Sequence, residues 1–322
     1  MTVIITDCDH KDIEIESSLF NTESIPFKLK QCKTEDEVIQ HGQHASVFLN
    51  QYAPITEKVM KALPELKLVV RYGVGVNNVD LKAAEEYGVQ ICNVPDYGTN
   101  EVADHALALM LSLTRKIPLM NSYVKKGVWD YQKSIPIFRH GDQTVGIIGL
   151  GRIGLSFAHK AHALGCRVIG YDLKEESREI PDFIEKVTMD NILDQSDVIS
   201  IHCPLDTAYH LIGIAELRKM KETAYLINVS RGGIIDEQAL HEALQEKWIA
   251  GAASDVAEQE PLSPDTPLLQ HENFLCTPHM GWYSEQAALE LKRKAAEEAI
   301  RFLRNEPVYY PVNQLSNKGV KK

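Results

Sequence analysis

Short apolar runs alternate with amphipathic stretches along the whole chain. The apolar runs are rich in Val, Ile and Leu, and we expect strands at 3–6, 46–49, 67–71, 89–94, 145–148, 167–170, 198–202, 225–229, 249–254 and 273–276. Apolar residues at helical spacing predict helices at 34–40, 80–87, 101–114, 153–164 and 284–303. Strands that alternate with helices are typical of parallel sheets, so the pattern predicts an α/β fold.

The clearest motif lies at residues 144–172, which read TVGIIGLGRIGLSFAHKAHALGCRVIGYD. Gly149, Gly151 and Gly154 have the spacing G-x-G-x-x-G directly after an apolar run. In a dinucleotide-binding turn the first glycine makes the tight turn, the second admits a pyrophosphate and the third lets the next helix pack closely. Alone, such glycines also occur in ordinary loops. The order strand, glycines, helix, strand and acid favours a dinucleotide site.

Two further features of this motif predict cofactor contacts. The helix should begin near Arg152 and Ile153, where unpaired N–H groups and the positive end of the helix dipole face the phosphates. Asp172 follows the glycines by about twenty residues, where a carboxylate accepts hydrogen bonds from the adenosine ribose. Asp172, with Glu175 and Glu176 close behind, would repel a ribose 2′-phosphate. NAD is therefore expected rather than NADP.

Length, charge and cysteine usage narrow the class of protein. A chain of 322 residues exceeds what one hydrophobic core usually serves, so two domains are expected. The net charge of -11 argues against nucleic acid or an anionic membrane as the main partner. The start, MTVIITDCDHKD, lacks a signal-peptide pattern, and no apolar run reaches membrane-spanning length, so we expect a cytoplasmic protein. Six cysteines without C-x-x-C pairing indicate neither disulfides nor a metal site.

Three further segments carry expectations of their own, and one of them, 116–139, has a less regular pattern. The stretch 101–114 is apolar on nearly all sides and predicts a helix buried all round, as at a domain junction. The stretch 116–139 carries Trp129, Tyr131 and Phe138 among basic residues. It is interpreted either as a surface loop or as an arm that packs against a second subunit. The lysine-rich end, 318–322, is expected to be frayed.

Three side chains with acid–base or anion-binding chemistry follow predicted strands. Arg231 lies in Ser-Arg-Gly-Gly, Glu260 precedes Pro-Leu, and His279 lies in Thr-Pro-His. Each alone has a simpler explanation, namely a surface arginine, a solvated glutamate and a structural histidine. In open α/β sheets, however, the carboxyl ends of the strands face the ligand crevice. A guanidinium can hold a carboxylate there through two hydrogen bonds.

Taken together, these motifs resemble one family, the D-isomer-specific 2-hydroxyacid dehydrogenases. The resemblance rests on GLGRIG at 149–154, SRGG, the Glu-Pro-Leu segment and TPH, and extends to RYGVGVNNVD at 71–80 and CNVPDYGTNEVADHALALM at 92–110. The stretch HMGWYSEQ at 279–286 is similar to the branch that contains the C-terminal-binding proteins, which are transcriptional corepressors.

The resemblance implies a fold and an assembly. It implies two Rossmann-like domains with parallel sheets, in which the cofactor domain is inserted into a discontinuous substrate domain. Residues 1–98 and 286–322 would form the substrate domain, and residues 99–285 the NAD-binding domain. It also implies a homodimer formed through the cofactor domain.

The same resemblance implies roles for individual residues. His279 would exchange the proton of the keto or hydroxyl oxygen, Glu260 would orient the imidazole, and Arg231 would hold the substrate carboxylate. Further substrate contacts would come from backbone N–H groups of Val74 and Gly75, with Trp282 shaping the pocket. Besides the glycine turn and Asp172, the expected cofactor contacts are Val102, Cys203, Pro204, Val229, Ser230, Asp255 and His279.

The function expected from these observations is NAD-dependent interconversion of a small 2-keto acid and a D-2-hydroxy acid. One alternative is an NAD(H)-sensing binding protein of the C-terminal-binding-protein type, with little turnover. A Rossmann enzyme with another adenosine cofactor would leave Glu260 and His279 without roles.

Overall fold

The computed structural model describes residues 2–172 and 179–315. Glu175, Glu176 and the lysine-rich end at 318–322 lie outside the described residues. The chain divides into two compact units. Unit 1 comprises Met1–Gly98 and Ser284–Lys322, and unit 2 comprises Thr99–Tyr283. Each unit holds a parallel sheet with helices on both faces, which confirms the predicted α/β class.

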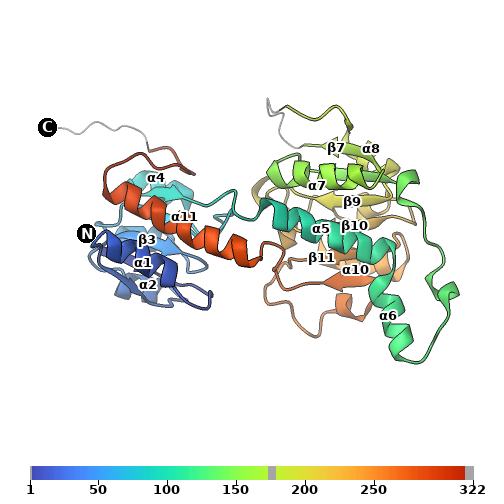
Figure 1. Ribbon diagram of the computed structural model, residues 1–322, viewed down its shortest axis with the longest axis horizontal. Helices are drawn as coiled ribbons and strands as arrows, with labels where there is room; N and C mark the ends of the chain where they lie inside the picture. The colour runs from blue at the N-terminus through green and yellow to red at the C-terminus, as the bar shows by residue number, and fades with distance from the viewer. Residues whose placement is uncertain (1, 173–178, 316–322) are drawn as a thin grey trace. The chain divides into compact units, whose positions relative to one another are not determined.

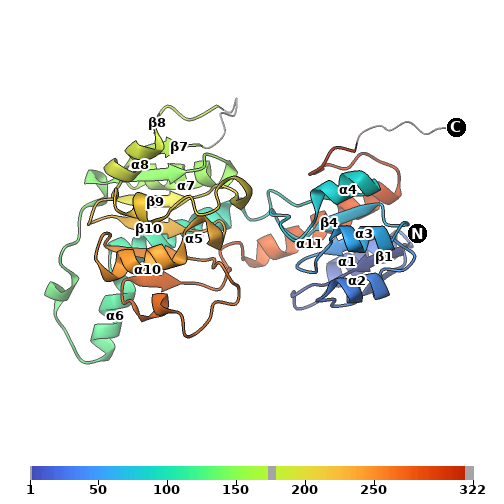
Figure 2. The same ribbon diagram turned by 180° about the vertical axis from the view of Figure 1, so that it is seen from behind.

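Unit 1 contains a five-stranded sheet in the order β2-β1-β3-β4-β5. The strands are β1 (Thr2–Ile5), β2 (Phe27–Leu29), β3 (Ala45–Asn50), β4 (Leu68–Arg71) and β5 (Gln90–Cys92). The helices are α1 (Glu14–Thr22), α2 (Glu35–His41), α3 (Glu57–Ala62), α4 (Leu81–Tyr87) and α11 (Glu285–Leu303). Helices α1 and α11 cover one face of this sheet, and α2, α3 and α4 cover the other (Figure 1, Figure 2).

The helix boundaries of unit 1 follow from local chemistry. The Asp80 side chain accepts a hydrogen bond from Ala83 N and begins α4, and Gly88, with φ +69°, ends it. Ser284 caps α11 in the same way by accepting from Ala287 N at 2.9 Å. The sequence pattern did not predict α1, α3 or β2, because these elements are short and mostly polar on their exposed sides.

Unit 2 contains a seven-stranded parallel sheet in the order β12-β11-β10-β9-β6-β7-β8. The strands are β6 (Thr144–Ile148), β7 (Arg167–Tyr171), β8 (Ile184–Lys186), β9 (Val198–Ile201), β10 (Tyr225–Asn228), β11 (Gly251–Ser254) and β12 (Phe274–Cys276). The α-helices are α5 (Thr99–Thr114), α6 (Ile117–Lys125), α7 (Arg152–Ala163), α8 (Met189–Gln195), α9 (Ile214–Leu217) and α10 (Glu237–Gln245).

Two apolar clusters hold unit 2 together, one on each face of its sheet. Helices α5 and α7 cover one face (Figure 1), and α8 and α10 cover the other (Figure 2). Successive strand residues point to opposite faces, so that Val198 joins the α5–α7 cluster while Ile199 joins the α8–α10 cluster. Strands buried on both faces explain why the sequence reads as continuous apolar runs.

The chain reverses its direction across the unit 2 sheet between β6 and β9. From β6 it proceeds outward through β7 and β8, and then returns to β9 on the other side of β6. Such a switch point leaves a crevice at the carboxyl ends of the two strands, where α/β proteins bind their ligands. The glycine turn begins at this point, directly after β6.

One expectation for the segment after residue 98 was wrong. Helix α5 is not buried all round, because Asp104 and Ala108 are exposed while its opposite face packs against α7 and the sheet. The segment 116–139, for which a loop and an arm were both left open, contains α6 and a short 3-10 helix, Tyr131–Ser134. Lys116, with φ +54°, separates α5 from α6.

Candidate active site

The glycine turn of unit 2 requires the absence of side chains at two positions. Gly149 has φ +98°, and a Cβ there would lie 2.7 Å from the backbone N of Cys203. A Cβ on Gly154 would lie 2.0 Å from the carbonyl oxygen of Gly149. Gly151 stands at the N-cap of α7 and offers no side chain to the first helical N–H groups. The start of α7, at Arg152 and Ile153, therefore fits a phosphate group.

Asp172 lies beside this turn at the end of β7. Its Oδ2 accepts a hydrogen bond from the backbone N of Leu150 at 2.7 Å, which holds the carboxylate next to the glycines. A carboxylate in this position fits the hydroxyl groups of an adenosine ribose. The turn, the helix start and Asp172 together fit a dinucleotide.

Four of the other expected cofactor residues lie at the carboxyl ends of β9, which neighbours β6, and of β10, which neighbours β9, and a fifth lies on α5. Cys203 is buried, and burial raises the pKa of its thiol to about 12, so it is not a nucleophile at neutral pH. Pro204 follows it. The Ser230 hydroxyl donates to Ile201 O at 3.0 Å and ties the end of β10 to β9, beside Val229. Val102 packs half-buried against the apolar cluster of α5 and α7.

One residue beneath the turn was not predicted. The Cβ of His202 lies 3.4 Å from the position that a Gly154 Cβ would take, and its ring centre lies 5.2 Å from that of Phe157 on α7, with the two rings tilted. Its Nε2 lies 2.9 Å from Ser200 Oγ, while its Nδ1 is buried with no hydrogen-bond partner among the described residues. Burial lowers the pKa of His202 to about 3. No sequence motif marks this position, because its importance depends on the neighbouring strand.

Arg231, Glu260 and His279 follow three neighbouring strands of unit 2, β10, β11 and β12. His279 Nδ1 lies 2.7 Å from Glu260 Oε2. The other carboxylate oxygen, Oε1, accepts from Ala257 N at 3.1 Å. The two side chains are about two-fifths exposed, at 40% for His279 and 41% for Glu260. The expected histidine–glutamate pair is thus present in the geometry, with one ring nitrogen held by the carboxylate.

The segments that carry Arg231 and Glu260 are packed backbone against backbone. A Cβ on Gly232 would lie 1.9 Å from the carbonyl carbon of Ala257. Arg231 Nη1 donates to Ser230 O at 2.7 Å, and its own carbonyl accepts from Asn228 Nδ2 at 2.7 Å. The arginine is therefore held close to the end of β10 and to the loop of Glu260.

The charge of this group of residues favours an ionised Glu260. Burial favours the neutral carboxyl, but the hydrogen bond and charge of His279, the N–H of Ala257 and the charge of Arg231 outweigh it. They lower the pKa of Glu260 below its ordinary value. A carboxylate on one ring nitrogen stabilises the protonated imidazole. The pair can therefore hold a proton that the other ring nitrogen, Nε2, exchanges with a ligand.

Asp255 is buried at the end of β11 and holds the turn around His279. It accepts from Thr277 Oγ1 at 2.5 Å, from Met280 N at 3.0 Å and from Gly281 N at 2.8 Å. Burial raises the pKa of this carboxyl, but the hydrogen bonds, first that of His105 and then these three, outweigh it and lower the pKa. This structural role was not predicted.

Val74, Gly75 and Trp282 are the remaining predicted substrate residues. Val74 and Gly75 follow β4 in unit 1, and the carbonyl of Val74, a residue that is 42% exposed, accepts from Asn93 Nδ2 at 2.7 Å. Trp282 is half-buried in unit 2, with its ring edge-to-face at 5.5 Å from Tyr283.

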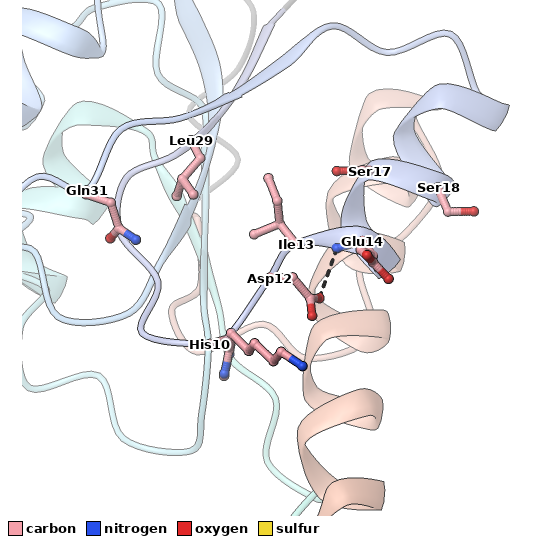
Figure 3. A pocket seen from close by; sticks show the side chains of 9 residues that line it. His10, Asp12, Ile13, Glu14, Ser17, Ser18, Leu29 and Gln31 are labelled. Carbon is pink, nitrogen blue, oxygen red and sulfur yellow. Dashed lines mark hydrogen bonds between the residues drawn. The ribbon is translucent and has the colours of Figure 1, made fainter.

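One cavity lies elsewhere, in unit 1. It measures about 610 Å³ and is bordered by the loop before α1, by α1 and by the end of β2 (Figure 3). Asp12 in its wall already binds Lys292 at 2.9 Å, and Gln31 binds the backbone of Cys8. None of the predicted site residues lines this cavity. We therefore place the candidate site at the strand ends of unit 2.

Neither a metal-binding cluster nor a membrane-spanning helix occurs in the described part of the chain. Residues 2–172 and 179–315 contain no group of three or more His, Cys, Asp or Glu that could hold a metal ion. Within the same ranges, no helix combines the length and apolar character that crossing a bilayer requires. The six cysteines form no disulfides.

Comparison with known proteins identifies the class and then the family. Residues 107–281 match the model of the D-isomer specific 2-hydroxyacid dehydrogenase, NAD binding domain. A glyoxylate reductase of Korarchaeum cryptofilum is 39% identical over 274 residues, covering 83% of this chain and 81% of that protein. Unit 2 is therefore the NAD-binding unit of an oxidoreductase. The chain belongs to the D-isomer-specific 2-hydroxyacid dehydrogenase family, which confirms the resemblance seen in the sequence.

Two further similarities extend over most of the chain. A D-3-phosphoglycerate dehydrogenase of Archaeoglobus fulgidus is 37% identical over 291 residues, and the match spans 89% of this chain but only 55% of that protein. Among solved structures, the D-lactate dehydrogenase of Aquifex aeolicus complexed with NAD and lactic acid has a TM-score of 0.84 at 25% identity, covering 95% of this chain and 96% of that one. These matches support NAD as the cofactor.

Proposed function

We propose that this protein reduces a small 2-keto acid to the D-2-hydroxy acid, or oxidises the hydroxy acid, with NAD(H). The observation that carries the proposal is the His279–Glu260 pair beside Arg231, at the carboxyl ends of strands in the same sheet as the glycine turn. When bound, the nicotinamide supplies or takes up the hydride. The chain must then supply a proton to the keto oxygen and a cation for the carboxylate.

His279 is proposed as the residue that exchanges the proton. Because Glu260 holds Nδ1, the opposite nitrogen, Nε2, gives the proton to the keto oxygen in reduction and takes it from the hydroxyl in oxidation. An ionised Glu260 stabilises the imidazolium before reduction and keeps the ring oriented afterwards. Its lowered pKa means that this support is present at neutral pH and is lost only as the pH falls through the acidic range.

Arg231 is proposed as the cation that holds the substrate carboxylate. Its planar fork can bind both carboxylate oxygens, which a lysine cannot reproduce. Val74 and Gly75 are proposed as further substrate residues through their backbone N–H groups, and Trp282 as a residue that limits the substrate side chain. On the cofactor side, Val102, Asp255 and His279 would border the nicotinamide.

The substrate is proposed to be a small 2-keto acid such as glyoxylate. The support is the similarity to a glyoxylate reductase, which covers four-fifths of each chain. The phosphoglycerate dehydrogenase match is at 37% identity but covers only about half of that protein, so it supports the chemistry more than the substrate.

We further propose a homodimer formed through unit 2. Helix α6 has no buried residue, although its sequence is largely apolar. Beyond it, Trp129 is 89% exposed, Tyr131 75% and Ile135 63%. Figure 1 shows α6 and the following segment extending from the rest of unit 2. Exposed apolar side chains of this kind are typical of an interface. The Trp129→Asp change should therefore give monomers in light scattering, whereas Leu289→Asp, at an exposed position of α11, should not.

The decisive experiment follows NADH absorbance with a panel of 2-keto acids. The His279→Ala variant should lose about 100- to 10,000-fold in kcat while NADH still binds, because only the proton transfer is removed. His44→Ala is a matched control, since His44 also pairs with a glutamate at 3.2 Å but lies on the surface of unit 1.

Two results would overturn the proposal in different ways. Equal turnover of the His279→Ala variant and the parent protein would remove His279 from the reaction. Tight NADH binding by the parent protein, without reduction of any acid in the panel, would instead favour an NAD(H)-sensing protein of the C-terminal-binding-protein type.

A further inference from the structure

The backbone at His279 adopts a conformation that few non-glycine residues take. Its φ is +53°, in the left-handed region. His279 N donates to Asp255 O at 2.8 Å, and the next two N–H groups, of Met280 and Gly281, donate to the Asp255 carboxylate. The turn that aims the imidazole at Glu260 is therefore held by one buried aspartate. Such a conformation persists only when its surroundings over-determine it.

The Asp255 carboxylate has a further neighbour on helix α5. His105 Nε2 lies 2.9 Å from Thr277 Oγ1 and 3.4 Å from Asp255 Oδ1. The Thr277 hydroxyl has one hydrogen, and its oxygen lies 2.5 Å from Asp255 Oδ1, a short contact that requires this hydrogen to point to the carboxylate. Thr277 Oγ1 must then accept from His105. His105 Nε2 therefore carries a hydrogen, and the direction of the whole chain of bonds is determined.

Packing holds the His105 ring in this place. The side chain is only 16% exposed, and its neighbours on α5, Ala103 and Ala106, are fully buried. A Cβ on Gly281 would lie 3.2 Å from the ring and 2.8 Å from Asp255 Oδ2. The ring thus packs closely against the backbone just beyond His279. The N–H of His105 is presented from a helix that belongs to the core of unit 2.

We propose that His105 is a positioning residue for the proton-transferring histidine. Its Nε2–H orients the Thr277 hydroxyl, the hydroxyl and two backbone N–H groups orient the Asp255 carboxylate, and that carboxylate holds the left-handed turn at His279. The inference rests on the proposed role of His279. It adds a residue from α5 that lies outside the histidine–glutamate pair and acts on the reaction only through the turn.

The test replaces His105 with leucine and with glutamine. Leucine removes the donor but keeps an apolar side chain of similar bulk, and should lower kcat about tenfold, with the Kd of NADH and the KM of the keto acid changed less than about threefold. The side-chain amide of glutamine can place an N–H near the former Nε2, and should restore kcat to within about threefold of the parent protein. A residue that merely supported the fold would not be rescued by the donor alone.

A matched control is available at the other end of the same helix. His140 Nε2 lies 3.0 Å from the hydroxyl of Thr114, the last residue of α5, in a second histidine–threonine contact away from Asp255. His140→Leu should leave kcat unchanged. If it lowered kcat as much as His105→Leu, the effect would be a general loosening of α5, and the proposal would fail.

A second variant covers the case in which His105→Leu does not fold. Thr277→Val removes only the hydroxyl that connects His105 to Asp255, so it should lower kcat by a similar factor. In the double variant the two changes should not multiply, because both break the same chain of bonds. Parent-like kcat in Thr277→Val, or fully multiplicative effects, would overturn the proposal.

If His279→Ala keeps its turnover, the proposed function fails. If it loses turnover while His105→Leu and Thr277→Val do not, only the positioning role fails.

Discussion

Each unit has a glycine-containing turn after a central strand, and the two turns differ in what fills the space beside the glycine. In unit 1, Gly73 follows β4 with φ +130°, and a Cβ there would lie 1.7 Å from the guanidinium of Arg71 in the same strand. In unit 2, Gly149 follows β6 with φ +98°, and its Cβ would meet the backbone of Cys203, after the neighbouring strand.

The helix after each turn explains the difference in function. Helix α7 begins within three residues of Gly149, so its first N–H groups open onto the crevice between β6 and β9. Helix α4 begins only at Leu81, and the Asp80 side chain already caps it. A glycine after a strand is thus not sufficient for a phosphate site. A helix whose first N–H groups are not capped must begin within a few residues of the glycine. The backbone after the neighbouring strand must also lie so close that only a glycine fits.

The largest effect should come from Gly154→Ala. Its Cβ would lie 2.0 Å from Gly149 O, a backbone atom that cannot move without opening the turn. NADH affinity should fall about 100-fold, equivalent to about 2.7 kcal/mol. Gly213→Ala in the same unit is the control, since its Cβ would meet only the flexible Glu216 carboxylate at 3.5 Å. Calorimetric titration that showed unchanged affinity for Gly154→Ala would contradict the close packing of the turn.

We expect an intermediate effect, on stability, from His202, which lies beneath the glycine turn of unit 2. Its pKa of about 3 in the folded protein is below the ordinary value of 6.5, so protonation favours the unfolded chain. The stability contribution is complete above pH 6.5 and is lost as the pH falls toward 3. Between pH 7 and 5 the free energy of unfolding should decrease by about 2 kcal/mol through this residue.

Urea unfolding at several pH values checks this prediction. In the His202→Gln variant, the decrease in the free energy of unfolding between pH 7 and 5 should be smaller than in the parent protein by about 2 kcal/mol. If the free energy of unfolding of His202→Gln depended on pH as in the parent protein, the His202 ring would take up a proton in the folded protein.

The smallest effect should come from Gly73→Ala in unit 1. The atoms in its way belong to the flexible end of Arg71, so backbone strain at positive φ is the main cost, about 1 kcal/mol. Gly88→Ala, with φ +69° and nothing within 4 Å of its Cβ, should cost a similar amount. NADH affinity should not change in either variant. A much larger loss of stability for Gly73→Ala would show that Arg71 is as immovable as the backbone beside Gly149.

The strands and the motifs at their carboxyl ends could be predicted from the sequence. Most sheet strands were found because strands buried on both faces are continuous apolar runs, whereas β2 and β8, which are short and largely exposed, were missed. Arg231, Glu260 and His279 were found because short motifs at strand ends share one edge of a parallel sheet, and the structure brings Glu260 and His279 to 2.7 Å. Helix α6 was missed, because it buries no residue and so carries little of the pattern by which helices are recognised.

The amino-acid sequence by itself determined the α/β class, the dinucleotide turn, the acid at Asp172 and the family, because each depends on local patterns and on their order along the chain. Only the tertiary structure decided what holds those features in place. His202 beneath the turn, and His105 and Thr277 around Asp255, come from segments up to 172 residues apart, as between His105 and Thr277. Their hydrogen bonds depend on which strands and helices become neighbours, and no local pattern of residues carries that information.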